Sequence, residues 1–274
     1  MTFEQLMQYG LIAFKKGTIV QENELSLGTG WLALCIIICA VIGYFIGSLN
    51  FGVIISRLYG ADIRTKGSGN AGATNMMRVY GKKASILTFI GDISKTIVAV
   101  FLGRLLIFGY VGAYVTGLFV IIGHAFPIYY KFKGGKGVAA ISAFCLVTEP
   151  IIFLIELAIF LIVLFGFKMV SLASIMIALI YPYMLSMIVG PGPHIIVGFI
   201  ASALVIFLHR KNIVRIFNHT EHKFNLGKKK KEQTTVANVT CVENSTPECE
   251  ENNTIIDEAP LENIKENENE ENKE

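Results

Sequence analysis

Charged side chains are scarce in this sequence of 274 residues, because Asp, Glu, Lys and Arg together make up 16% of it. Between residues 138 and 208 the charged residues are Glu149, Glu156 and Lys168. A water-soluble globule keeps charged residues on its surface, so long stretches without charge exclude that class. The sequence instead predicts segments that cross a membrane, where about 20 apolar residues make one helical span.

Patterns for metal binding are also lacking. Of the five cysteines, Cys35 and Cys39 lie one helical turn apart in an apolar run, and none has the spacing of a zinc site. We therefore expect no metal and no cofactor. The first thirty residues lack the compact order of basic, apolar and small residues that marks a cleaved signal peptide. We expect residues 1–30 to persist as an extracytoplasmic N-terminal extension.

Negative charge is rare before residue 231 and concentrated after it. Residues 1–231 carry 22 Lys and Arg against 8 Asp and Glu, whereas residues 232–274 carry 2 against 13. The Asn- and Glu-rich end has too few apolar groups to offset the entropy lost on ordering. We expect a membrane domain over 31–226 and a disordered cytoplasmic tail over 227–274 that is first basic and then acidic.

Seven apolar stretches are candidate helical spans, namely 31–47, 84–108, 111–130, 138–148, 151–167, 170–189 and 195–208. Positive charge marks cytoplasmic loops, and Lys and Arg cluster in 57–83, 131–136 and 210–231. If these clusters share the cytoplasm, the chain crosses the membrane an even number of times between them. The sequence thus predicts an all-α integral membrane protein, a bundle of seven transmembrane helices with short cytoplasmic motif loops and the N-terminus outside.

The stretch 138–148 leaves this count open. It is eleven residues long and ends at Glu149-Pro150, which favours a broken, tilted or partly embedded helix as much as a full span. Five spans is the alternative, with the region 138–189 crossing as one hairpin. The turn at 190–194 carries no Lys or Arg, as expected of an external turn.

The first polar segment, residues 67–78, reads GSGNAGATNMMR. Its glycines let backbone amides approach an anion, and Arg78 offers a bidentate fork for phosphate. Short polar contacts would come from Ser68, Asn70, Thr74 and Asn75. The alternative is a flexible turn with one arginine that reaches along the membrane surface.

The second polar segment, residues 131–137, reads KFKGGKG and precedes an apolar run. Exposed amides at a helix N-terminus beneath the Lys136 ammonium have the physics of a phosphate-binding loop. The segment is not a nucleotide P-loop, because Gly137 follows Lys136 where Ser or Thr is needed. The alternative is a basic loop that only contacts anionic lipid.

The third polar segment, residues 209–215, reads HRKNIVR and leaves the last apolar stretch. His209 could act as a general base or bind phosphate near neutral pH, or it could be an interfacial histidine without a role. Within the membrane zone, Asp92 and Lys95 stand three residues apart on a helix, and we expect a structural ion pair.

The order of these segments carries a resemblance to a known family. GSGNAGATNMMRVYGKK, then GHAFPIYYKFKGGKGVA, then HRKNIVRIFNHTEHKF resemble the motifs of the bacterial acyl-phosphate-dependent glycerol-3-phosphate acyltransferases, PlsY, over residues 31–226. The resemblance implies a seven-helix enzyme of the bacterial cytoplasmic membrane with its active site facing the cytoplasm. It implies transfer of an acyl group from acyl phosphate to the 1-hydroxyl of sn-glycerol 3-phosphate, giving lysophosphatidic acid, the first committed step of phospholipid synthesis. Membrane lipid is then a partner and nucleic acid is not, and a monomer suffices.

The resemblance also implies roles for particular residues. Those implied as catalytic are Ser68, Arg78, Lys136, Ser174, His209 and Asn212. Those implied to bind substrate are Asn70, Thr74, Asn75, Gly134, Gly135 and Gly137, with Glu221 as a structural carboxylate. Ser171 is a near neighbour of Ser174 and competes for its place. The chain departs from the family at Asn50, where proline is usual, and at Thr96, where glycine is common.

A transporter or lipid-handling protein, whose basic loops only collect anions, is the alternative function. Three glycine-bearing or basic segments on one face fit an enzyme with two phosphorylated substrates better. None of the five histidines is followed by Asp five residues later, which excludes the His-x-x-x-x-Asp signature of thioester-using acyltransferases.

Overall fold

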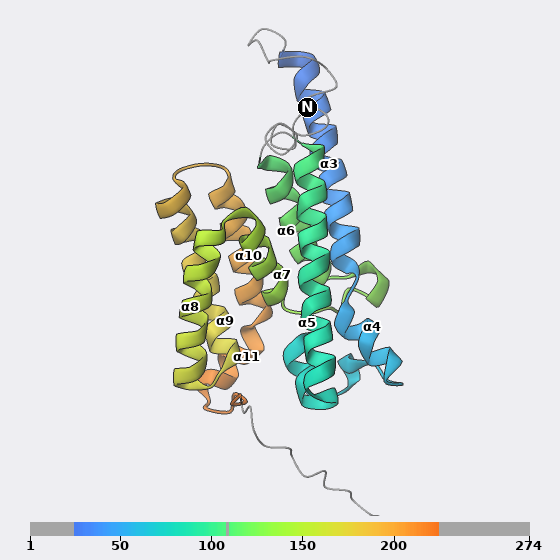
Figure 1. Ribbon diagram of the computed structural model, residues 1–274, viewed down its shortest axis with the longest axis vertical. Coiled ribbons are helices and arrows are strands. Elements are labelled where there is room, and N and C mark those ends of the chain that lie inside the picture. Colours follow the sequence, from blue (N-terminus) through green and yellow to red (C-terminus); the bar gives the residue numbers. More distant parts are fainter. Residues whose placement is uncertain (1–24, 108–109, 225–274) are drawn as a thin grey trace, which may run out of the picture. The chain divides into compact units, whose positions relative to one another are not determined.

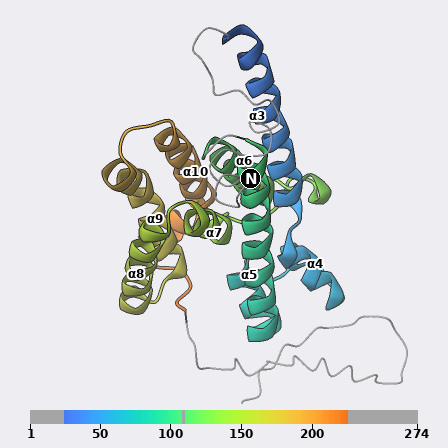
Figure 2. The ribbon, with the colours of Figure 1, turned by 45° about the horizontal axis from the view of Figure 1, so that its top comes forward.

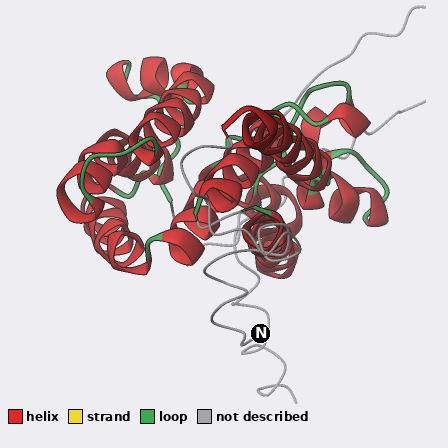
Figure 3. Cartoon of the chain, turned by 90° about the horizontal axis from the view of Figure 1, so that it is seen from above, coloured by secondary structure: helices red, strands yellow, loops and turns green. Residues whose placement is uncertain are grey.

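The computed structural model describes residues 25–107 and 110–224, and every regular element in these ranges is a helix (Figures 1 and 3). The elements are α3 (Leu25–Ser48), α4 (Phe51–Leu58), η1 (Ile63–Thr65), α5 (Ala73–Leu106), α6 (Val111–Ala125), η2 (Ile128–Tyr130), α7 (Val138–Thr148), α8 (Pro150–Phe167), α9 (Val170–Met184), η3 (Leu185–Val189), α10 (His194–Leu208) and α11 (Arg210–Phe217). Of the expected extension 1–30, residues 25–30 belong to α3. The rest of it and the expected tail 227–274 lie outside the described residues.

Five segments within the described ranges are long and apolar enough to cross a membrane: Trp31–Leu58, Ala73–Leu106, Val111–Tyr130, Pro150–Phe167 and Val170–Val189. A sixth is the pair His194–Leu208 and Arg210–Phe217, bent by 57°, if the pair counts as one span. The eleven residues of α7 rise only ~16 Å, against a hydrocarbon core of about 30 Å. A count of seven spans therefore depends on α7.

The outer surface of the helices is apolar. On α8, the side chains of Leu154, Ile162 and Phe165 are 63%, 72% and 63% exposed. Exposure of such large apolar side chains to water is unfavourable, whereas contact with the apolar tails of lipid is not. The exposed faces are thus those of a membrane protein.

Close helix packing depends on small residues. Gly43 and Gly47 of α3 face the backbone of α6 at Thr116 and Val120, and a Cβ atom on either glycine would collide with that backbone. In lipid, such close backbone contact replaces the hydrophobic effect as the force between helices. The two helices run side by side as a result (Figures 1 and 2).

Helix α5 is longer than one span. Its 34 residues rise ~51 Å, and Gly81 interrupts the helix with φ of 85°. The part before Gly81 contains Arg78, and Lys82 and Lys83 follow Gly81 directly, ahead of the apolar stretch expected from residue 84. The interruption gives the part with Arg78 its own direction relative to the span.

Four helices connect the second polar segment to the third. Helix α7 packs against α5, α6 and α8, and α8, α9 and α10 pack in sequence. Lys136 before α7, Ser171 at the start of α9 and His209 after α10 line one cavity. The chain therefore leaves the cavity along α7 and α9 and returns to it along α8 and α10, as two antiparallel hairpins (Figure 2).

Candidate active site

A cavity of about 210 Å³ lies where the three polar segments meet. The first segment contributes Ser68, Asn70, Thr74, Asn75 and Arg78; the second contributes Lys136 and Gly137; the third contributes His209, Asn212 and Arg215; and α9 adds Ser171 and Ser174. Residues up to 147 positions apart in the sequence are thus brought together. All six residues expected to be catalytic line this cavity.

Asn75 organises the first segment from within. Its buried amide nitrogen donates to the carbonyl oxygens of Ile63, Lys66 and Asn70, and its oxygen accepts from the amide of Ser68 at 2.9 Å. Because these contacts engage both polar atoms, Asn75 shapes the loop that presents Ser68. Asn75 also lines the cavity, and its direct binding of substrate stays a prediction.

The loop leaves backbone donors at the start of α5. Gly67 and Gly69 adopt φ of 59° and 71°, in the left-handed region that favours glycine. Gly72 precedes α5 without a side-chain cap, and Ala73 and Thr74 line the cavity. The first amides of a helix have no partner within the helix and attract anions. A phosphate in the cavity would meet these amides.

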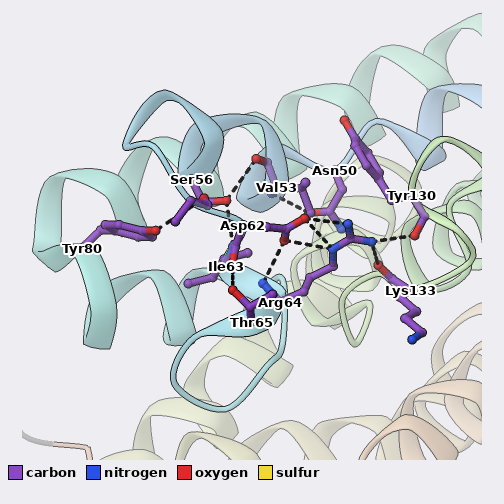
Figure 4. A network of polar contacts seen from close by, with 11 residues as sticks. Asn50, Val53, Ser56, Asp62, Ile63, Arg64, Thr65, Tyr80, Tyr130 and Lys133 are labelled. Carbon is purple, nitrogen blue, oxygen red and sulfur yellow. Dashed lines mark hydrogen bonds and ion pairs between the residues drawn. The ribbon is translucent and has the colours of Figure 1, made fainter.

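A polar network joins the turn just ahead of the first segment, around η1, to the second segment (Figure 4). Asp62 caps η1 and forms a bidentate pair with Arg64, whose Nη2 lies 2.6 Å from Asp62 Oδ2. Hydrogen bonding from Arg64 lowers the pKa of Asp62 below its ordinary value. The same guanidinium donates to the carbonyl oxygens of Tyr130, at 2.6 Å, and Lys133. Arg64 thus fixes the loop that leads to Lys136.

The glycines of the second segment, which were expected to bind substrate, differ in where their amides point. The amide of Gly134 donates to the carbonyl of Ala125 at 3.1 Å, and that of Gly135 to the carbonyl of His124 at 3.0 Å. Neither glycine lines the cavity, whereas Gly137, with φ of 79°, does. The amides of Gly134 and Gly135 therefore close the end of α6 instead of facing a phosphate, and the two glycines permit close packing.

Lys136 extends into the cavity and is held by the third segment. Its Nζ donates to Asn212 Oδ1, and Asn212 Nδ2 donates to Ser171 Oγ and Glu221 Oε1, each at 2.7 Å. Burial lowers the pKa of Lys136 to about 8, with a further lowering by Arg215 and Arg78 that Glu221 partly offsets. The ammonium is thus poorly solvated and available to a bound anion.

Glu221 is the shared acceptor of this network. It accepts from Ser171 and Asn212 and forms an ion pair with Arg215 Nε at 2.7 Å. Burial raises the pKa of Glu221, but the hydrogen bonds from Ser171, Arg215 and Asn212 outweigh it, so the pKa lies below its ordinary value. The carboxylate thereby fixes both Asn212 and Arg215, in keeping with the structural role expected of it.

Two further residues expected to be catalytic, His209 and Ser174, are oriented by backbone carbonyls. His209 Nδ1 lies 2.8 Å from the carbonyl oxygen of Val205, and a carbonyl only accepts, so Nδ1 carries the proton and Nε2 is the free ring nitrogen. Ser174 Oγ donates to the carbonyl of Val170 at 2.9 Å. It is Ser171, not Ser174, that joins the Asn212 and Glu221 network.

The cavity has a cationic part and an apolar part. Its cationic side chains are Arg78, Lys136 and Arg215, whereas its one carboxylate among the described residues, Asp92, is paired with Lys95 at 2.8 Å. Apolar side chains that include Phe89 of α5 and Phe160 of α8 complete the lining. A phosphorylated molecule with a long apolar chain matches both parts.

Four polar lining residues were not among the expected site residues, namely Ser171, Arg215, Asp92 and His124. Arg215 belongs to the third segment, Asp92 had been expected to pair with Lys95, and Ser171 had been named as the competitor of Ser174. His124 gave no signal of its own beyond its place ahead of the second segment. Across residues 25–107 and 110–224, no cluster of three or more His, Cys, Asp or Glu side chains is arranged to hold a metal ion.

Comparison with known proteins assigns the family. Residues 37–219 match the model of the family described as glycerol-3-phosphate acyltransferase. A glycerol-3-phosphate acyltransferase of Geotalea daltonii is 40% identical over 188 residues, which cover 68% of this chain and 97% of the relative. One of Clostridioides difficile is 40% identical over 200 residues, which cover 71% and 97%.

Solved structures agree with this assignment. The crystal structure of PlsY, an integral membrane glycerol 3-phosphate acyltransferase, in its glycerol 3-phosphate form matches with a TM-score of 0.65 and 33% identity, over 69% of this chain and 96% of that one. The lysophosphatidic acid form of PlsY matches with a TM-score of 0.63. With its apolar helices and its three segments around one cavity, the chain belongs to the integral membrane glycerol-3-phosphate acyltransferase family.

Proposed function

We propose that the protein transfers an acyl group from acyl phosphate to the 1-hydroxyl of sn-glycerol 3-phosphate, giving lysophosphatidic acid and phosphate. The observation that carries this proposal is the cavity itself, where Arg78, Lys136 and Arg215 converge beside the apolar side chains of Phe89 and Phe160. The cations suit the phosphates of two substrates, and the apolar wall suits an acyl chain.

In this proposal the phosphates are held by charge and by backbone donors. Lys136 and Arg78 bind phosphate oxygens, Gly137 lets one approach closely, and the amides at the start of α5, beside Thr74, add hydrogen bonds. Ser68 and Asn70 lie on the same loop and orient the substrates by hydrogen bonding. Gly134 and Gly135 act indirectly, by packing the loop that carries Lys136.

The chemical step needs no covalent enzyme intermediate, because an acyl phosphate is already activated. The hydroxyl oxygen forms a bond to the acyl carbon, the bond from that carbon to the phosphate oxygen breaks, and phosphate leaves with the bonding electrons. The hydroxyl proton passes to a phosphate oxygen of the substrates. His209, through the free Nε2, and Asn212 orient the acceptor. No group of the protein then has to act as a nucleophile.

The serines of the cavity support this mechanism. A neutral serine without an adjacent base is a weak nucleophile, and Ser174 already donates its hydroxyl proton to a backbone carbonyl. We expect no acyl group on Ser68 or Ser174 when turnover with radiolabelled acyl phosphate is quenched in acid and the protein is examined by mass spectrometry. A stable acyl-serine at either position that forms and decays at the rate of turnover would contradict the mechanism.

The proposed setting is the bacterial cytoplasmic membrane with the cavity open to the cytoplasm, where both anionic substrates are made. The positive charge around the three segments supports this orientation. Single cysteines placed at Lys83, Lys133 and Lys211 should resist an impermeant thiol reagent in intact cells, while one at Gly192 should react. Labelling of Lys133→Cys but not Lys83→Cys from outside would contradict a shared face.

The test of the function uses purified protein, acyl phosphate and radiolabelled glycerol 3-phosphate, with lysophosphatidic acid as the product measured. Acyl thioester in place of acyl phosphate tests the donor, and we expect no product from it. The same protein in sealed vesicles tests the alternative function, transport. Uptake of glycerol 3-phosphate without an acyl donor, and no lysophosphatidic acid with one, would favour the transporter and overturn the proposal.

A further inference from the structure

A buried group of three ionisable side chains lies at the wall of the cavity. Asp92 and Lys95 of α5 and His124 of α6 are 2%, 5% and 3% exposed. Lys95 Nζ lies 2.8 Å from Asp92 Oδ1, 2.6 Å from the carbonyl oxygen of Leu49 and 3.0 Å from His124 Nδ1. The expected pair of Asp92 with Lys95 is therefore present, and it has a third member.

These contacts decide which nitrogen of His124 carries a proton. An ammonium group has only donors, so the contact of 3.0 Å between Lys95 Nζ and His124 Nδ1 requires the ring nitrogen to accept. His124 Nδ1 must therefore accept, so it is unprotonated. Asp92 Oδ1, 3.4 Å from the same nitrogen, is a second acceptor drawn to the same ammonium. In the neutral ring the proton is then on Nε2.

The ring of His124 lies at the wall of the cavity, with Nε2 next to the second segment. His124 lines the cavity, as does Asp92. A Cβ atom added to Gly135 would collide with His124 Nε2, which places this nitrogen directly against the loop that carries Lys136. Within the described residues, no acceptor for Nε2 is present. The cavity histidines therefore differ: His209 offers an unprotonated Nε2 and His124 a protonated one.

We propose that His124, held as the Nε2-protonated form by Lys95 and Asp92, donates a hydrogen bond to an oxygen of a phosphorylated substrate in the cavity. Lys95 and Asp92 are positioning residues in this arrangement. The inference rests on the proposed function for the identity of the substrate, but the protonation of His124 is a property of the protein alone. A neutral donor stabilises negative charge on oxygen without giving up its proton.

Substitutions of His124 test the donor. The amide nitrogen of Gln reaches close to the position of Nε2, whereas that of Asn reaches only to Nδ1. We expect His124→Gln to retain activity within about tenfold of the wild type, and His124→Asn and His124→Leu to lose about 100-fold or more, the usual effect of removing one such donor. If these variants mainly lower kcat, the oxygen that accepts from His124 belongs to the reacting acyl carbonyl. If they mainly raise KM for glycerol 3-phosphate, it belongs to the phosphate of the acceptor. Equal activity of Gln and Leu variants that melt at the wild-type temperature would overturn the donor.

The ring can also be observed without substrate. In the full-length protein with ¹⁵N-labelled histidine, nitrogen chemical shifts should report the Nε2-protonated form for the signal that His124→Gln removes. The signal of His209 should report the Nδ1-protonated form, and Lys95→Met should release His124 to a mixture. His194→Gln, which alters a histidine bonded to the carbonyl of Gly190, serves as the control and should leave the His124 signal unchanged. A signal of the Nδ1-protonated form from His124 would overturn the inference even if the enzyme is active.

Discussion

At the scale of single residues, the charge of Lys136 can be tested directly through the pH dependence of the reaction. Burial lowers its pKa to about 8, so the ammonium is present below that pH and is lost as pH rises through it. We expect kcat/KM for glycerol 3-phosphate, which reports the free enzyme, to fall above about pH 8. Arg stays charged in this range, so Lys136→Arg should move the fall to higher pH even if it lowers the maximum. A wild-type profile that stays flat to pH 9.5 would contradict a phosphate-binding ammonium.

Gly135 provides a second residue-scale test. The structure shows its amide bonded to the carbonyl of His124 and its Cα against the imidazole of the same residue. Gly135→Ala should therefore displace the ring and lower activity about 100-fold, the loss expected from one displaced donor. Gly166→Ala on α8 is the matched control, because nothing lies near a Cβ at that position and Ala favours a helix. Full activity of Gly135→Ala would show that the packing of this glycine is unimportant.

The side chain of Glu221 contributes to the stability of the folded site. Glu221→Ala removes the shared acceptor of Asn212, Ser171 and Arg215. Of these only Asn212 is buried, and its unpaired amide costs about 1–3 kcal/mol. Thermal unfolding in detergent should show a lower melting temperature, with Glu221→Gln intermediate because its amide oxygen still accepts. Since the folded-state pKa of Glu221 is depressed, its contribution is present at neutral pH and is lost as pH falls through that pKa. A wild-type-to-Gln difference that persists unchanged in acid would contradict this account.

At the scale of elements, Arg64 links η1, just ahead of the first segment, to the second segment. Arg64→Lys keeps the charge but loses the planar fork that reaches Asp62 and the carbonyls of Tyr130 and Lys133 together. We expect it to raise KM for glycerol 3-phosphate about tenfold, equivalent to 1.4 kcal/mol. Arg57→Lys is the control, because Arg57 lies 5.3 Å above the same Tyr130 ring. An equal effect of both variants would assign the result to charge near Tyr130 instead of to the fork.

Helical spans were predictable from the sequence because their ends carry strong signals. The stretches 111–130, 138–148 and 170–189 agree with the structure, since Gly, Pro or charged residues bound each apolar run. The short helices α4 and α11 were not predicted. Each has eight residues, so neither contains a run long enough for its periodicity to stand out.

The site was predictable in its members but not in their contacts. Arg78, Lys136 and Asn212 carry recognisable chemistry in their own segments. Three contacts depend on how distant parts of the chain pack. They are the hydrogen bonds of Asn75 to carbonyl oxygens, the hydrogen bond of Ser171 with Asn212, and the close approach of Gly135 to His124. Local sequence contains no information on which backbone donors a fold will leave free.

At the scale of the whole molecule, three segments separated by most of the chain form one cationic cavity inside a shell of apolar helices. Two hairpins, α7 with α8 and α9 with α10, carry the chain away from this cavity and back to it. The first of these is short on one side because α7 ends at Thr148, just before Pro150 begins α8. In the proposed function, this arrangement brings water-soluble phosphates and a lipid chain to one place.

The most direct test of this account compares two lysines on one loop. Lys136 lines the cavity, whereas the side chain of Lys133 is exposed and not part of its lining. With acyl phosphate and radiolabelled glycerol 3-phosphate, we predict that Lys133→Met forms lysophosphatidic acid at close to the wild-type rate, and that Lys136→Met loses about 100-fold or more, as for other groups that stabilise transferred charge. Equal rates for the two variants would show that the reaction does not take place in this cavity.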